Sequence, residues 1–172
     1  MSALDRLWAG WRHDYIAMPP RESAAPAAGD CVFCGILACE APDSETHVIW
    51  RHSGGAAVAL LNAYPYVSGH LLVLPTRHVA DPEDLGDEES AAVGRGVMAA
   101  TRAVKVAYEP DGLNVGANLG RAAGAGVPGH LHIHVLPRWE GDTNFMTSVA
   151  DTRVLPEALS VSDERLRRAW SG

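Results

Sequence analysis

The chain has 172 residues, 47% of them hydrophobic and 20% charged, and its formal net charge is −7. This is the composition of a globular protein with one sizeable core, and no apolar run approaches the ~20 residues that a membrane span needs. The negative charge disfavours a duplex nucleic-acid partner, whose phosphates require many cationic contacts. We therefore expect no membrane and no nucleic acid among the partners.

The first 30 residues predict a short helix followed by a linker. Apolar residues recur at spacings of three and four: Leu4, Leu7, Trp8, Trp11 and Tyr15. This pattern predicts an amphipathic helix over 4–16, packed on the body or on a partner chain. The prolines and alanines of 18–29 indicate an irregular linker. The first residues lack the basic and apolar regions of a signal peptide, so we expect a cytoplasmic location.

Cys31 and Cys34 have C-x-x-C spacing, and Cys39 follows them. Two cysteines are half of a structural zinc site, which takes four nitrogen or sulfur ligands in a tetrahedron. The alternatives are two reduced, buried cysteines at a turn, or a redox pair, which here lacks the usual βαβ setting. We expect Cys39 to be a small buried hydrophobe. An odd number of cysteines fits a reducing compartment.

The middle of the chain predicts strands and one long helix. Three apolar runs, separated by glycine- and proline-containing turns, predict an antiparallel meander: 47–51, 55–62 and 70–74. Residues 87–108 carry an apolar stripe at helical spacing and predict the main helix. Gly94 and Gly96 within it each cost about 1 kcal/mol relative to Ala, unless they admit close packing. A short strand is expected at 113–118, and a C-terminal helix at 157–170.

Residues 129–138 carry the most reactive chemistry in the chain. His130, His132 and His134 alternate with aliphatic residues. A period of two predicts a β-strand with the histidines on one face and the aliphatic residues buried on the other. The outer two histidines would then be about 13 Å apart at their Cα atoms, so the three should divide the work between them.

The stretch 119–129, just before this strand, is rich in glycine and contains Arg121. Glycines let backbone N–H groups approach an oxyanion closely, so we expect a phosphate to bind here. The alternative is a loop that merely needs positive φ angles. Arg77, Arg121 and Arg138 all lie beside these segments and are candidate donors to an anion.

The run from His130 to Leu136 resembles the H-φ-H-φ-H-φ-φ signature of the histidine-triad (HIT) nucleotide-binding superfamily, in which φ is aliphatic. Other segments are similar to dinucleoside-polyphosphate-cleaving members: 60–62, 69–75 and 135–138. A bacterial branch described as diadenosine tetraphosphate phosphorylases or hydrolases is resembled by further blocks: 7–12, 31–34, 118–124 and 139–146. The resemblance covers nearly the whole chain.

Together with the patterns above, the resemblance implies an α+β domain. We expect an antiparallel sheet of about five strands, one long helix across it and a C-terminal helix. Residues 1–172 would form a single HIT domain: 1–30 as N-terminal helix and linker, 31–138 as the core, and 139–172 as a C-terminal extension. A symmetric homodimer or higher homo-oligomer is expected, formed through the long helix or the sheet edge.

The resemblance also implies roles in catalysis. His132 would be the nucleophile that forms a covalent nucleotidyl intermediate, and its other ring nitrogen would donate most simply to a backbone carbonyl. His134 would contact the phosphate, and Asn118 the region of the scissile phosphate. His130 would hold the strand through the metal or a backbone hydrogen bond.

Binding roles are implied for further residues. The substrate-binding set is Asn62, His70, Arg121, Gly124, Gly126 and Trp139. Asn62 would address the nucleoside sugar, although it could instead be a turn residue. Structural zinc would be held by Cys31, Cys34, His78 and His130.

The sequence departs from the family pattern at the loop. Many members carry Gly-Gln-Ser or Gly-Gln-Thr there, whose side-chain donor reaches the leaving group, whereas Gly124-Ala125-Gly126 supplies none. Retention of His134 leans toward a hydrolase, and the flanking blocks lean toward a phosphorylase that uses inorganic phosphate. Three alternatives are a nucleoside phosphoramidate hydrolase, a non-catalytic nucleotide-binding module, and a cupin-type metal enzyme with Glu140 as its carboxylate.

Overall fold

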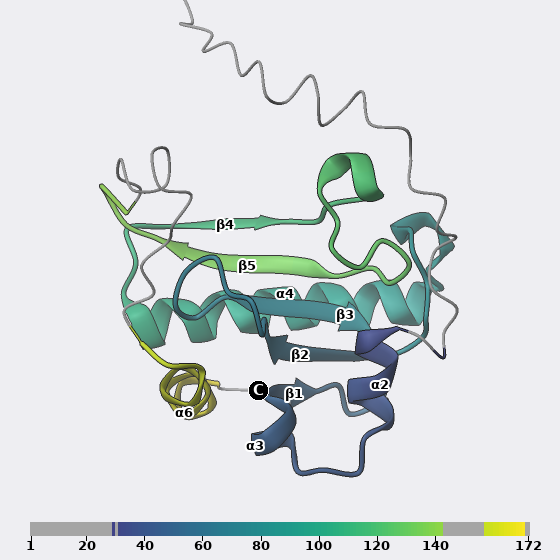
Figure 1. Cartoon of the computed structure of the whole chain (residues 1–172), viewed down its shortest axis with the longest axis horizontal. Coiled ribbons are helices and arrows are strands. Elements are labelled where there is room, and N and C mark those ends of the chain that lie inside the picture. The colour runs from purple at the N-terminus through teal and green to yellow at the C-terminus, as the bar shows by residue number, and fades with distance from the viewer. Residues whose placement is uncertain (1–28, 30, 143–156, 171–172) are drawn as a thin grey trace, which may run out of the picture.

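The computed structural model describes residues 29, 31–142 and 157–170. The helix expected at 4–16 and nearly all of the expected linker lie outside the described residues. In chain order the elements are α2 (Val32–Ala38), α3 (Asp43–Thr46), β1 (Val48–Arg51), β2 (Ala57–Leu61), β3 (Leu71–Pro75), η2 (Pro82–Asp84), α4 (Asp87–Tyr108), β4 (Gly112–Gly116), η3 (Arg121–Ala123), β5 (Ile133–Arg138) and α6 (Leu159–Ala169) (Figure 1).

A five-stranded sheet in the order β1-β2-β3-β5-β4 forms the centre of the molecule, and all neighbouring strands are antiparallel. The α+β class, the number of strands and the β1-β2-β3 meander are therefore confirmed. The histidine-bearing strand β5 lies between β3 and β4 and not at an edge. It is thus held by backbone hydrogen bonds on both sides, which makes it a rigid support for a site.

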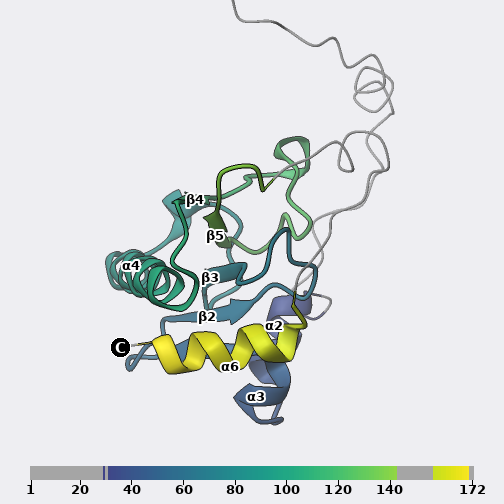
Figure 2. The same cartoon turned by 90° about the vertical axis from the view of Figure 1, so that its left-hand side faces the viewer.

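Helices cover both faces of this sheet: Figure 2 shows α4 on one side and α2 on the other. Alternate residues of the strands contribute to two cores. The α4 side includes Ile49, Ala57, Ala59, Leu61, Leu71, Val73 and Val135. The α2 side includes Val48, Val58, Leu60, Leu72 and Leu74. Because both faces are covered, strands such as β2 are buried at every position, which is why their sequences are continuous apolar runs.

The ends of four of the predicted strands differ from the observed ones by no more than two residues. His47 lies outside β1, because it adopts a left-handed conformation with φ 55° at the C-cap of α3. Asn118 lies beyond β4, which ends at Gly116. The main helix has the predicted bounds, α6 is shorter than predicted, and α2 and α3 were not predicted.

The triad strand also begins later than predicted. β5 starts at Ile133, and the preceding residues continue without pairing to β3. The backbone N–H of Leu131 donates instead to the carbonyl of Val79, at 2.6 Å. The backbone at Leu131 is therefore tied to the segment after β3.

Helix α6 is anchored on α4 and on the β1 edge of the sheet. Leu166 is 0% exposed and belongs to the α4-side core. Arg167 donates to the carbonyls of Asp43 and Val48, both at 2.7 Å, and pairs with Asp163 at 2.6 Å. These bonds join the C-terminal helix to the start of the sheet. None of the described helices is both long enough and apolar enough to cross a membrane.

The two glycines inside α4 have different surroundings. A Cβ atom at Gly96 would lie 2.9 Å from side-chain atoms of both Trp50 and Val73, whereas nothing lies within 4 Å of one at Gly94. Gly96 therefore lets α4 approach the sheet, as close packing requires, and Gly94 has no such reason to be glycine.

Substituting the two glycines should consequently have opposite effects. Gly96→Ala overpacks the helix–sheet contact and should lower the free energy of unfolding by about 1–3 kcal/mol. Gly94→Ala, the matched control, should raise it by roughly 0.5–1 kcal/mol through helix propensity. Chemical denaturation measures both values. Equal or greater stability of Gly96→Ala would show that α4 does not need the close approach.

Candidate functional site

The three triad histidines lie at the start of β5 and just before it. His130 is 1% exposed, His132 6% and His134 8%. The histidine face is therefore buried, and not only the aliphatic face: Phe33 of α2 packs on His130 and His132, and Tyr66 stacks on His134. Burial lowers the pKa of His130 and of His134 below the ordinary value, and in His134 the nearby His132 adds to this effect. Both rings are thus neutral at physiological pH.

One ring nitrogen of His132 is hydrogen-bonded to the backbone. Its Nδ1 lies 2.8 Å from the backbone carbonyl oxygen of His130. Since a carbonyl oxygen only accepts, Nδ1 carries the proton and Nε2 keeps its lone pair. The expected hydrogen bond to a backbone carbonyl is present. A neutral imidazole with a bare Nε2 is the form that can attack phosphorus.

His134 contacts a second buried histidine. Its Nδ1 lies 2.8 Å from Nε2 of His70, which is 0% exposed. His70 is thus buried against His134, and its contact with a substrate remains a prediction. Its other nitrogen, Nδ1, accepts from the backbone N–H of Tyr66 at 3.2 Å. The Tyr66 ring stacks on His134, with centroids 5.8 Å apart and an interplanar angle of 21°.

Asn62 has the geometry of a turn residue. Its Oδ1 accepts from the backbone N–H of Tyr64 at 3.0 Å, and its Nδ2 lies 3.2 Å from Nδ1 of His70. Both ends of the amide are thus engaged within the turn between β2 and β3. A contact from Asn62 to a sugar remains a prediction.

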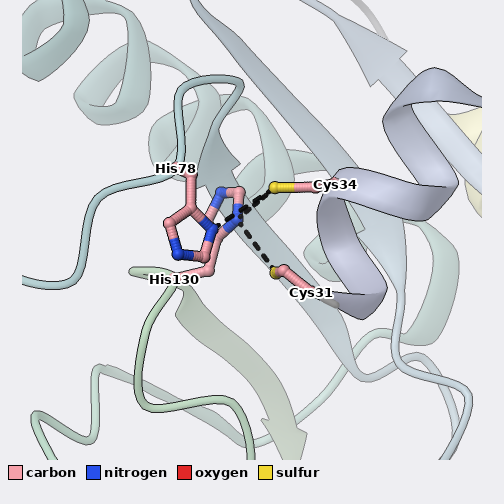
Figure 3. A group of neighbouring side chains, drawn as sticks. All are labelled: Cys31, Cys34, His78 and His130. Atoms are coloured by element: carbon pink, nitrogen blue, oxygen red, sulfur yellow. Dashed lines mark hydrogen bonds between the residues drawn. The ribbon is translucent and has the colours of Figure 1, made fainter. Parts of the chain in front are cut away.

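Cys31, Cys34, His78 and His130 form a separate cluster, whose four ligand atoms all lie within 4.8 Å of one another (Figure 3). Nδ1 of His130 is 3.5 Å from Sγ of Cys31 and 3.6 Å from Sγ of Cys34, and Nδ1 of His78 is 3.3 Å from Sγ of Cys34. In a tetrahedral zinc site with usual bond lengths, a sulfur and a nitrogen ligand are about 3.6 Å apart. The four residues could therefore hold a metal ion.

The second nitrogen of His130 supports this arrangement. Its Nε2 lies 2.8 Å from the carbonyl oxygen of Pro75, to which it donates. The lone pair of Nδ1 therefore faces the two cysteines, as a metal-ligating histidine requires. Burial raises the pKa of Cys34, and the neighbouring Cys31 adds to this effect. Without a cation nearby, the Cys34 thiol therefore keeps its proton at neutral pH. A bound cation would reverse that preference.

Cys39 is not the buried hydrophobe that we expected. It is exposed, and its Sγ accepts from the backbone N–H of Ala41 at 3.4 Å. The reason is its position directly after the last turn of α2, in the connection to α3.

Phe33 joins the metal cluster to the triad and was not identified from the sequence. It is 5% exposed, and its ring centroid lies 5.5 Å from that of His130 and 5.2 Å from that of His132. Cys31 at the N-cap of α2 and Cys34 within the helix flank Phe33, so the segment that supplies two cluster ligands also packs on His130 and His132. The C-x-x-C spacing was the available signal, because residues three apart lie on one side of a helical turn.

The glycine loop lies between β4 and β5. Gly124 takes φ 93°, which favours glycine, and Gly126 is exposed. Gly116 pairs with His134, so a continued register would bring Asn118 opposite His132. A Cβ added at Gly124 would lie 3.9 Å from Nδ2 of Asn118. The loop therefore begins beside the triad, which suits the expected binding of a phosphate.

The three candidate arginines lie in different surroundings. Arg77 pairs with Glu89 at 2.7 Å and lowers the pKa of that carboxyl to about 2. Arg138 pairs with Asp142 at 2.5 Å and donates to Asn114. Arg121 is exposed on η3, within the glycine loop. Of the three, Arg121 is thus the one that belongs to the loop beside the triad.

Trp139 lies away from the histidines within one chain. It follows the C-terminal end of β5, and its ring packs edge-on against Tyr108 of α4, with centroids 6.3 Å apart. His134 is five residues earlier along extended chain, about 16 Å away. The structure does not bring Trp139 to the triad, and its contact with a substrate remains a prediction. Residues 143–146 of the same block lie outside the described part of the chain.

The fold and the three clustered histidines define a histidine-triad protein. The profile of the HIT domain matches residues 42–141, and the chain belongs to the HIT family. An AP-4-A phosphorylase of Mycobacterium tuberculosis (strain ATCC 25618 / H37Rv) is 40% identical over 173 residues, which cover 98% of this chain and 85% of that protein.

Solved structures agree with this assignment. A Zn-bound histidine triad family protein from Mycobacterium smegmatis matches with a TM-score of 0.64 and 31% identity, covering 84% of this chain and 96% of that one. A HIT-like protein involved in cell-cycle regulation from Bartonella henselae matches with a TM-score of 0.67 and 25% identity, covering 85% and 99%.

Proposed function

We propose that this protein cleaves dinucleoside polyphosphates, with diadenosine tetraphosphate as the representative substrate, and transfers the nucleotidyl group to inorganic phosphate. The observation that carries the proposal is the bare Nε2 of His132, fixed by the bond from Nδ1 to the carbonyl of His130. Family membership supports a nucleotide-processing enzyme. The relative named AP-4-A phosphorylase, similar along 98% of the chain, supports this substrate class.

The reaction would proceed in two displacements. Nε2 of His132 attacks the α-phosphorus, a P–N bond forms, and the P–O bond to the leaving nucleoside triphosphate breaks. An oxygen of inorganic phosphate then attacks the same phosphorus, the P–N bond breaks, and ADP leaves as His132 regains its lone pair. The products are ADP and ATP. Water in place of phosphate would give AMP and ATP.

The surrounding residues would bind and orient the phosphates. His134 lies beside His132, with ring centroids 5.0 Å apart, so it can reach the same phosphoryl group. Asn118, Gly124, Gly126 and Arg121 lie in the loop that leads into the triad and would offer donors to the polyphosphate. Because Ala125 replaces a side-chain donor, backbone groups of this loop would have to stabilise the leaving group.

Product analysis with and without phosphate tests the proposed reaction. We expect ADP plus ATP from diadenosine tetraphosphate, and only when inorganic phosphate is present. AMP plus ATP at the same rate regardless of phosphate would instead identify a hydrolase. Cleavage of an adenosine phosphoramidate alone would move the protein to the other main branch of the family, and binding without turnover would leave a nucleotide-binding module.

We also propose that the cluster of Cys31, Cys34, His78 and His130 binds zinc. The support is the set of sulfur–nitrogen separations and the orientation of His130. With four protein ligands no position is left for substrate, so zinc would act as a structural link between α2 and the triad. A cupin-type catalytic metal would need such an open position and Glu140, which is not in this cluster.

Assembly as a homodimer or higher homo-oligomer remains a prediction, and so does a cytoplasmic location. Two features support the assembly. β4 ends the sheet, and Val115 on it is 48% exposed. Met98 and Val106 on α4 are 56% and 66% exposed. Apolar side chains at a strand edge and on the neighbouring helix are what a symmetric interface would cover.

A further inference from the structure

His70 and His134 form a buried pair whose protonation can be deduced from their neighbours. Nε2 of His70 lies 2.8 Å from Nδ1 of His134, and the two residues are 0% and 8% exposed. One proton is shared in this contact, and the question is which ring carries it. The answer fixes whether the far nitrogen of His134 donates or accepts.

The neighbours of His70 settle its tautomer. The backbone N–H of Tyr66 can only donate, and it is directed at Nδ1 of His70 at 3.2 Å. The side-chain amide of Asn62 is oriented by the N–H of Tyr64 on Oδ1, so its Nδ2 also faces Nδ1 of His70, at 3.2 Å. With donors directed at it, Nδ1 carries no proton. The proton of neutral His70 is therefore on Nε2.

The tautomer of His134 follows. Nε2–H of His70 donates to Nδ1 of His134, which must be bare, so the proton of His134 is on Nε2. That atom is buried and has no hydrogen-bond partner among the described residues. A buried donor without an acceptor costs free energy, which a ligand oxygen at this point would recover.

We propose that His70 is a positioning residue that fixes His134 as a neutral ring with its proton on Nε2, so that His134 donates a hydrogen bond to a phosphoryl oxygen of the substrate. This inference rests on the proposed function, since it assigns the donor to the phosphoryl group that His132 attacks. In this state His134 does not act as a base. The lowered pKa of His134, caused by burial and by His132, agrees with a neutral ring.

The two amide side chains provide a matched pair of variants at position 70. Glutamine can place its amide nitrogen near the position of Nε2, so His70→Gln retains a donor to His134. Asparagine reaches only the position of Nδ1, so His70→Asn keeps an acceptor for the N–H of Tyr66 but loses the donor to His134. If residue 70 acted on His134 only through packing, His70→Gln and His70→Asn would have similar effects. His52→Asn is the control for the removal of a histidine elsewhere, in the β1–β2 turn.

The first readout is the tautomer of His134 in the unliganded, 15N-labelled full-length protein, from long-range 1H–15N spectra of the histidine rings. The signal is assigned by its disappearance in His134→Gln. We expect a proton on Nε2 in the wild type, His70→Gln and His52→Asn, and a mixture of tautomers in His70→Asn. A proton on Nδ1 in the wild type overturns the proposal, and so does an unchanged pattern in His70→Asn.

The second readout is the kinetics of dinucleotide cleavage. Loss of a positioned donor to a reacting phosphoryl group should lower kcat of His70→Asn by about tenfold to hundredfold and change KM by less than about threefold. His70→Gln should stay within about threefold of the wild type. Equal losses in both variants would overturn the positioning role. If the wild type cleaves no dinucleotide, the proposed function fails, and the spectra still decide the state of His134.

Discussion

His132→Asn is expected to lower kcat for dinucleotide cleavage by more than about 10⁴-fold while leaving the Kd of the nucleotide within about threefold. The lost Nε2 makes a bond only along the reaction path, so it contributes to the transition state and not to the ground-state complex. Asparagine can still occupy the position of Nδ1 and donate to the carbonyl of His130. Steady-state kinetics and isothermal titration calorimetry measure the two quantities.

A second measurement isolates the covalent step. Rapid quenching of the wild type with the dinucleotide, in the absence of phosphate, should reveal a protein carrying one nucleotidyl group, and mass spectrometry should locate it on His132. His52→Asn, which alters a histidine far along the chain beside Arg95, should retain both turnover and the adduct. More than about a tenth of the wild-type kcat in His132→Asn would refute the nucleophile.

The three histidines of one short segment each have a different hydrogen-bond partner. The carbonyl of Pro75 accepts from Nε2 of His130, whose Nδ1 then faces the cysteines, and the carbonyl of His130 accepts from Nδ1 of His132, whose Nε2 is then without a proton. Nε2 of His70 lies against Nδ1 of His134. A backbone carbonyl or a buried ring thus decides which nitrogen of each imidazole is available. The sequence period places the rings in a row, but it does not show these partners, two of which lie in or next to β3.

The sheet and the main helix could be predicted because their patterns are long and physically distinct. The alternation from His130 to Val135 fits only the two-residue period of a strand. The apolar stripe of residues 87–108 fits only the 3.6-residue period of a helix. Continuous apolar runs such as 57–61 fit a sheet covered on both faces. The metal cluster was also predicted as a set, and the structure brings its four residues together.

Other features depend on contacts that the sequence does not encode locally. Helix α2 has seven residues, with Gly35 among them, so it has too few turns to produce a periodic signal. Its cover over the triad, and hence the role of Phe33, depends on packing against distant strands. The ion pair of Arg77 forms with Glu89, which lies twelve residues away in the sequence.

Loss of the metal cluster is the second change with a large expected effect. Cys34→Ala should abolish zinc binding and lower the stability of the protein. A ligand present at 1,000 times its Kd stabilises the folded state by about 4 kcal/mol, and for a domain of this size each kcal/mol shifts Tm by roughly 2–4 °C. We therefore expect a decrease in Tm of roughly 8–16 °C.

The turnover of Cys34→Ala should fall as well, although the residue does not contact the substrate. Without the cluster, α2 loses its link to His130, whose carbonyl orients His132, and Phe33 loses its fixed place against both rings.

Elemental analysis after zinc-replete expression should find about one equivalent per chain in the wild type, as four-ligand sites hold one ion. Cys39→Ser is the matched control: it removes an exposed cysteine outside the cluster and should match the wild type in zinc, Tm and kcat. Less than about a tenth of an equivalent in the wild type would reject the zinc site, and an unchanged Tm in Cys34→Ala would reject its structural role.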